Sequence, residues 1–196
     1  SLFFAMAGLG IVISFAFIYG DQVIRWSEGT QTAMFALTNI SAAAGAVLFG
    51  LVQDRIGNLR TYRITLLVWL AAIVGIHQTN ALSAATGGAL GPEGVYLCVG
   101  ALAGLCLGAT QSAGRTVVAL LSPPGRSGEM FGFWGLAGKL AAAAGLLLLG
   151  ALQTAFGLAN SILLCALLFS CAFVVAGRVD ERRGAANAAE APSSGA

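Results

Sequence analysis

Six long apolar stretches, separated by short polar segments, occupy almost the whole of this 196-residue chain. Each is close to the ~20 residues that an α-helix needs to cross the roughly 30 Å hydrocarbon core of a bilayer. The strands of a membrane barrel would be shorter and would alternate in polarity, so the pattern favours helices. The expected spans cover residues 2–20, 31–52, 62–80, 95–121, 131–155 and 158–177. The pattern predicts an all-α polytopic membrane protein.

Composition excludes most soluble classes of protein. Hydrophobic residues make up 58% of the chain and charged residues only 9%, against about 25% charged residues in a typical soluble domain. A soluble protein of this size could not cover its surface with so few charges. The net charge of +2 and the lack of a basic stretch interleaved with aromatic residues argue against nucleic-acid binding. We therefore expect the lipid bilayer as a partner and no nucleic acid.

The basic residues are distributed unequally between alternate loops. With the N-terminus inside, the inner segments are 53–61, 122–130 and the tail from 178, and the outer ones are 21–30, 81–94 and 156–158. Of the ten basic residues, only Arg25 belongs to the outer side. The inner segments, their flanks and the inner span ends hold Arg55, Arg60, Arg63, Arg115, Arg126, Lys139, Arg178, Arg182 and Arg183. By the positive-inside rule, both termini are expected in the cytoplasm.

The chain divides into one six-helix transmembrane domain, residues 1–177, and a tail, residues 178–196. The tail is small, polar and low in complexity, and we expect it to be disordered and cytoplasmic. The Gly- and Ala-rich segment 81–94 is typical of an exposed outer loop. Because the chain begins with Ser1 and an apolar run follows at once, we expect it to be a piece of something longer.

Glycine and cysteine positions inside the spans indicate packing. Gly100, Gly104 and Gly108 are four residues apart, so they share one helix face and offer a groove to a neighbouring helix. The cysteines lack CxxC spacing and nearby histidines, and we interpret them as buried apolar thiols. They are Cys98, Cys106, Cys165 and Cys171. We expect no metal and no cofactor.

The string GLVQDRIGNLR, from Gly50 to Arg60, connects the second and third spans. Asp54 lies at the C-terminal end of a membrane helix, where the negative end of the helix dipole disfavours an anion. It therefore needs compensation from Arg55, from Arg60 or from the N-terminus of another helix. Gly57 permits a sharp turn. An ordinary basic cytoplasmic turn would explain the arginines but not the spacing of the glycines and the aspartate.

This string resembles the G-x-x-x-D-R-x-G-x-x-R signature that major facilitator superfamily transporters carry between the second and third helices of each six-helix half. The resemblance implies a conformational latch, in which the charges contact a helix end of the opposite half and stabilise one access state. The latch residues would be Gly50, Asp54, Arg55, Gly57 and Arg60.

A second stretch, residues 108–139, is similar to the vacuole-effluxer-like branch of that superfamily, which includes fungal vacuolar amino-acid effluxers and many bacterial members. The shared positions are Gln111, Arg115, Pro124, Gly125, Arg126, Glu129, Phe131, Gly132, Phe133, Gly138 and Lys139. The chain departs from the branch after Asp21, where members continue with glycine and this chain has Gln22. The resemblance implies a C-terminal half, helices seven to twelve, in a bacterial plasma membrane. Its partner would be an N-terminal six-helix half, from the same protein or a duplicate chain.

Polar residues inside the spans are the candidates for a cavity or gate. Gln111 and Arg115 are four residues apart and share a helix face. Arg115 is either a gate residue or an arginine that extends to the headgroups. Lys139 lies eight residues into its expected span, where a cavity or interhelical role is favoured. Asn39, with its neighbour Thr38, could bind a solute or join helices.

Three further polar or aromatic features have both a structural and a functional interpretation. Asp21 either forms an ion pair with Arg25 or couples protons to transport. His77, at the outer end of the third span, is either an interfacial residue or a proton sensor. The tryptophans lie near span ends, as aromatic-belt residues do. They are Trp26, Trp69 and Trp134.

The function that these features favour is secondary transport of a small solute by alternating access, including efflux of an amino acid or a related metabolite. An enzyme is disfavoured, because the chain has one histidine, no GxSxG and no paired histidines. The remaining alternative is a non-transporting scaffold or regulator built on a transporter-like bundle. These two are distinguished by whether the polar residues of the first, second, fourth and fifth spans line one cavity.

Overall fold

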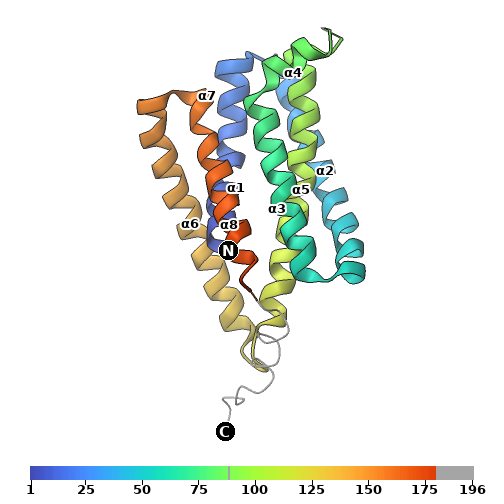
Figure 1. Cartoon of the computed structure of the whole chain (residues 1–196), viewed down its shortest axis with the longest axis vertical. Helices are drawn as coiled ribbons and strands as arrows, with labels where there is room; N and C mark the ends of the chain where they lie inside the picture. The colour runs from blue at the N-terminus through green and yellow to red at the C-terminus, as the bar shows by residue number, and fades with distance from the viewer. Residues whose placement is uncertain (88, 180–196) are drawn as a thin grey trace.

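The computed structural model describes residues 1–87 and 89–179, which form a bundle of long helices (Figure 1). In chain order the elements are α1 (Leu2–Tyr19), the π-helical turn η1 (Gly20–Ile24), α2 (Glu28–Ile56), α3 (Asn58–His77), α4 (Thr79–Ala85), α5 (Pro92–Leu120), α6 (Ser127–Phe156), α7 (Leu158–Ser161) and α8 (Leu163–Ala176). Six helical stretches of the described chain are long and apolar enough to cross a membrane. The predicted all-α membrane fold is confirmed. Most of the tail expected to be disordered, residues 180–196, lies outside the described residues.

Local sequence explains where the helices begin and end. The Ser27 hydroxyl accepts a hydrogen bond from the Thr30 amide at 3.1 Å and caps α2, and Pro92 begins α5, where its missing N–H costs nothing. Gly57 adopts φ +92° between α2 and α3, and Gly157 adopts φ +77° after α6. Side chains rarely adopt these backbone angles, so glycine permits both sharp turns. The expected loop 53–61 is therefore almost wholly helical, with Gly57 as its one non-helical residue.

Four helices form the centre of the bundle and two lie outside it. Each of the neighbouring pairs α5–α3, α3–α8 and α8–α1 packs along its length, while α2 packs on α5 and α6 packs on α1. Figure 1 shows the result, with α6 and α2 on opposite sides of the bundle. The α2–α3 turn and the α5–α6 turn lie at one end of the bundle, here called the Gly57 end. The short helix α4 marks the opposite end, here called the α4 end.

The core is centred on an aromatic pair. Trp69 of α3 stacks on Phe169 of α8, with ring centroids 5.1 Å apart, and both side chains are buried. The Trp69 indole N–H donates a hydrogen bond to the Thr110 hydroxyl of α5 at 2.8 Å. Trp69 thus ties three helices together in the middle of α3. The aromatic-belt interpretation is wrong for this tryptophan, because its ring packs inside the bundle and its N–H finds a partner there.

The glycine groove on α5 packs against α2, as predicted. A Cβ atom added at Gly104 would lie 2.6 Å from the Thr38 carbonyl oxygen, and one at Gly108 would overlap the Ala42 carbonyl. Gly45 of α2 makes the reciprocal close approach to the backbone of Leu105. Small residues let two backbones approach this closely in lipid, where apolar burial alone gives little driving force.

The cysteines differ in their surroundings. Cys106 and Cys165 are buried, whereas Cys171 is half-buried and Cys98 is exposed on the surface of the bundle. The prediction of buried thiols is therefore wrong for Cys98. An exposed cysteine on a membrane helix can contact lipid, which its modest polarity tolerates.

Helices α2 and α6 are much less covered than the central four. Within α2, the buried residues are Met34, Ser41, Gly45 and Gln53. Within α6, they are Ala141, Gly145 and Leu149. Both helices expose large apolar side chains along their remaining faces, including Ile40 and Val47 on α2 and Phe133 and Leu147 on α6. These faces are suited to contact with lipid or with another membrane protein.

Candidate functional site

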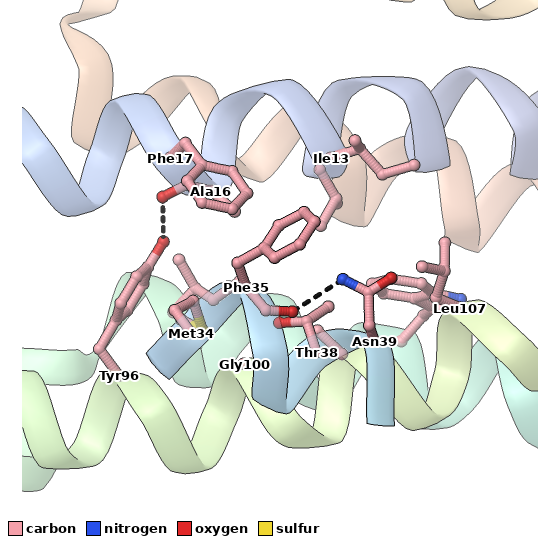
Figure 2. A pocket seen from close by; sticks show the side chains of 14 residues that line it. Ile13, Ala16, Phe17, Met34, Phe35, Thr38, Asn39, Tyr96, Gly100 and Leu107 are labelled. Atoms are coloured by element: carbon pink, nitrogen blue, oxygen red, sulfur yellow. Dashed lines mark hydrogen bonds between the residues drawn. The ribbon is translucent and has the colours of Figure 1, made fainter. Parts of the chain in front are cut away.

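An apolar pocket of about 210 Å³ lies between α1, α2, α3 and α5 (Figure 2). Its walls are Val12, Ile13, Ala16, Phe17, Met34, Phe35, Thr38, Asn39, Trp69, Ile76, Tyr96, Gly100, Ala103 and Leu107. Phe35 extends from α2 toward α1, where Ile13 lies on the facing side. Because most of these walls are apolar, the pocket can hold an apolar group. Thr38 and Asn39 are the polar side chains best placed to interact with an occupant.

Hydrogen bonds occupy the polar groups at the two ends of this pocket. At the α4 end, the Tyr96 hydroxyl donates to the Ala16 carbonyl at 2.7 Å and joins α5 to α1. At the other end, the Asn39 side-chain N–H donates to the Phe35 carbonyl at 2.8 Å, within α2. Figure 2 shows both bonds. Asn39 therefore keeps its amide oxygen available to a ligand.

A second pocket, of about 310 Å³, lies between α1, α5 and α6. Its walls are Met6, Leu9, Gly10, Ile13, Gln111, Trp134, Gly135, Gly138, Lys139 and Ala142. Ile13 borders both pockets, and Leu107 of the first pocket lies one helical turn from Gln111 of the second. The two pockets are therefore neighbours along the facing surfaces of α1 and α5.

Lys139 lies near the middle of a membrane helix. The 30-residue helix α6 begins at Ser127, earlier than the expected 131, and Lys139 follows Ser127 by twelve residues. At 1.5 Å per residue that distance is about 18 Å, close to half the helix length. The side chain is exposed, and within the described residues the one ion pair joins Arg126 to Glu129 at 3.4 Å. Lys139 is therefore a cation without a protein anion in this part of the chain.

Trp134 contributes a buried polar group to the same wall. Its indole nitrogen is shielded from solvent and has no hydrogen-bond partner among the described residues. Such orphaned donors are uncommon in folded proteins. Because α6 begins at Ser127, Trp134 lies seven residues inside the helix.

The residues predicted to form a latch lie at the Gly57 end, and none of them lines either pocket. Asp54, Arg55 and Arg60 are exposed, and none of them forms an ion pair within the described residues. The expected compensation of Asp54 by Arg55 or Arg60 is therefore not observed. Asp54 and Arg55 are successive residues of a continuous helix, so their side chains point about 100° apart. A Cβ atom at Gly50 would meet nothing within 4 Å.

Asp21 and Arg25 do not form the expected local ion pair. Asp21 lies in the π-helical turn η1, and Arg25 adopts a left-handed conformation with φ 56°. These two departures from α-helical geometry remove the alignment that would bring residues four apart together. Neither residue lines a pocket described above.

Arg115 is exposed on α5, five residues before its end at Leu120, and it lines neither pocket. Gln111, one turn earlier on the same helix, does line a pocket, so the two residues have different surroundings. The structure instead places Gln111 and Lys139, from two different helices, in the walls of one pocket, and Asn39 in the wall of its neighbour. Within the described chain, no cluster of three or more His, Cys, Asp or Glu side chains is placed to hold a metal ion.

The sequence did not indicate Ile13 as the residue that borders both pockets. Ile13 is one apolar residue among many in the first span, and nothing in the sequence distinguishes it. Tyr96 offered a weak signal, because a tyrosine hydroxyl inside an apolar span needs a partner.

His77 contacts the Ala159 carbonyl at 3.1 Å through Nδ1 and joins the end of α3 to α7. This contact agrees with its structural interpretation.

The described chain has six candidate membrane spans, four of them central and two outlying. Pockets lie between the first span and the fourth and fifth spans. This arrangement defines a six-helix half of a major facilitator-type membrane protein. The family model described as "Vacuole effluxer Atg22 like" matches residues 1–189, and the chain belongs to this family, a branch of the major facilitator superfamily. The resemblance stated from the two motifs is thereby confirmed. No curated protein and no solved structure matches the chain.

Proposed function

We propose that the chain is one half of a secondary transporter that moves a small solute by alternating access. The observation that carries the proposal is Lys139, a cation near the middle of a membrane helix, at the wall of a pocket, without a protein anion in the described chain. A charged residue at the bilayer centre costs about 2.5–3.5 kcal/mol on insertion scales. Such residues persist where they bind a solute, an ion or a partner helix. Transporter sites lie near the same depth.

The pockets support this proposal over a scaffold. The expected convergence is met in part: Asn39, Gln111 and Lys139, from the second, fourth and fifth spans, line two adjoining pockets instead of one, and the first span contributes apolar walls alone. A scaffold needs no such convergence. Transport also needs no covalent chemistry, so we propose a non-enzymatic protein whose solute is an amino acid or a related metabolite, exported from the cell.

The exposed faces of α2 and α6 support a second six-helix half as the partner. In a half that stood alone, Asn39 and Lys139 would face lipid. A second half, from the same protein or a duplicate chain, would cover these faces and enclose the pockets. It would also offer a helix N-terminus to Asp54, whose charge has no protein partner in the described chain.

The orientation follows from the basic residues. The Gly57 end carries Arg55, Arg60 and Arg126, and the α4 end carries Arg25. We place the Gly57 end in the cytoplasm. In this orientation, the latch segment controls closure on the cytoplasmic side.

The test is solute movement through the complete protein. Proteoliposomes that contain the whole natural protein would be loaded with a mixture of labelled amino acids and small organic acids, and the retained solutes would be measured over time. Protein-free liposomes are the control. Release of a defined solute, faster with the same solute outside, is expected of a carrier. Folded protein that releases none of the mixture, and exchanges none, would favour the scaffold.

A further inference from the structure

We infer that the surface on both sides of Ile13 binds a small organic anion, with Lys139 and Gln111 holding its carboxylate and the apolar pocket holding its apolar substituent. The inference rests on the proposed function and adds to it the charge and the shape of the solute.

Lys139 is the one lysine of the sequence, and it lines the pocket between α1, α5 and α6. An ammonium group at this depth is stable when an anion accompanies it. Within the described residues Lys139 has no acidic partner, and neither pocket has an Asp or Glu in its walls. The walls therefore favour a ligand with a net negative charge.

Gln111 of α5 lines the same pocket, and its side chain makes no hydrogen bond within the described chain. An amide N–H and an ammonium group on facing helices can each donate to one carboxylate. No acidic side chain in the walls of this pocket competes for these two donors.

The apolar pocket begins on the other side of Ile13, one turn along α5 from Gln111. The two volumes, about 210 and 310 Å³, together fall within the range of about 300–1,000 Å³ that is usual for small-molecule sites. A ligand that spans both would be anionic at one end and apolar at the other. An α-amino group on the same ligand would find no acidic side chain in these walls.

The experiment measures equilibrium binding to the whole natural protein in nanodiscs of zwitterionic phosphatidylcholine. The probe is 4-methylpentanoate, and its comparison ligands are the neutral 4-methylpentanamide and the zwitterion leucine. We expect the acid to bind at least tenfold more tightly than either. Lys139→Met should weaken binding of the acid at least tenfold, and Lys139→Arg should largely retain it. The control Arg126→Met removes a loop cation paired with Glu129, and it should leave binding unchanged.

A second measurement uses unaltered protein, so that it does not depend on the folding of a variant. Acetylation of the Lys139 amine, followed by peptide mass spectrometry, should slow in the presence of the acid and not of the amide. Equal binding of acid and amide, equal binding of leucine, unchanged affinity in Lys139→Met, or no protection of the amine would each overturn the inference.

Two other anionic groups can pair with Lys139, and each predicts a distinct experimental result. Either result would overturn the inference. If a carboxylate of the other half pairs with Lys139, the acid will not bind and Lys139→Met will lower thermal stability. If a lipid phosphate occupies the site, anionic phosphatidylglycerol in the nanodisc will protect the amine without any acid. Transport of another solute without acid binding would defeat the inference alone. Acid binding through Lys139 with no solute movement would defeat the proposed function alone.

Discussion

At the scale of single residues, the clearest internal contact is the hydrogen bond from Trp69 to Thr110, because both side chains are fully buried between α3 and α5. Thr110→Val keeps the shape of the side chain and leaves the indole N–H without an acceptor. We expect a loss of stability of about 1 kcal/mol, between the ~0.6 kcal/mol average for hydrogen bonds in membranes and the ~1–3 kcal/mol cost of an orphaned buried donor.

Thermal unfolding in detergent measures this loss. The matched control is Thr116→Val, because the Thr116 hydroxyl donates to the Ser112 carbonyl of its own helix at 3.2 Å. Equal effects of the two substitutions would show that the bond between helices adds nothing.

Asp54 is the residue that best tests the proposed latch. An anion at a helix C-terminus is unfavourable, so a partner in one access state would stabilise that state. Asp54→Asn should shift the balance of states by about 1–3 kcal/mol, the usual size of a coupling free energy, and transport should fall. Distance measurements between spin labels on the two halves report the populations.

The control for the latch is Glu129→Gln. Glu129 is an exposed carboxylate at the same end of the bundle, and it already has a local partner, Arg126, at 3.4 Å. The substitution Glu129→Gln should leave both the populations of the two access states and the transport rate unchanged. The same null result for Asp54→Asn would mean that the segment is an ordinary charged turn.

At the scale of elements, the packing of α2 on α5 depends on glycine. Gly108→Ala would place a methyl group on the Ala42 carbonyl, and backbone cannot move aside as a flexible side chain can. We expect a loss of about 1–3 kcal/mol, as for overpacking elsewhere. At Gly150, within α6, a Cβ atom meets nothing within 4 Å. Gly150→Ala should therefore be neutral, or stabilising by up to about 1 kcal/mol through helix propensity.

The two alanine substitutions are compared by thermal unfolding of the same preparation. Opposite or clearly separated effects are expected, because each variant adds the same methyl group to a helix. Equal stability of the two variants would show that α2 and α5 do not need their close approach.

At the scale of the whole molecule, the basic residues predict the orientation in the membrane. Single cysteines would be introduced at Gly87, near the α4 end, and at Ser127, near the Gly57 end, in a cysteine-free background. In intact cells, a membrane-impermeant thiol reagent should label the first position and spare the second. Labelling of the Gly87 position from the inside alone would reverse the orientation.

The proposed need for a partner half can be tested with the six-helix chain alone. The chain of residues 1–196, reconstituted as a strict monomer, should not transport solute, because Asn39, Gln111 and Lys139 would lack the second wall of their cavity. Addition of the other six-helix half should restore transport. Rapid solute release by the monomer would contradict the need for a partner.

The sequence by itself determined the features that depend on neighbours along the chain. Apolar runs of membrane-spanning length predicted the six helices, and the spacing of Gly100, Gly104 and Gly108 predicted a groove that does pack on α2. Gly57 was expected to permit a turn, and its φ of +92° agrees. The motif spacing also identified the superfamily and its branch.

The tertiary structure alone decided which polar residues meet. Asp21 and Arg25 have the spacing of an ion pair, but a π-helical turn and a left-handed residue separate them. Asn39, Gln111 and Lys139 are far apart in sequence, yet Asn39 lines one pocket bordered by α1 and the other two line its neighbour. Helix periodicity is a local property, whereas a pocket depends on which helices become neighbours and on how deep each one lies.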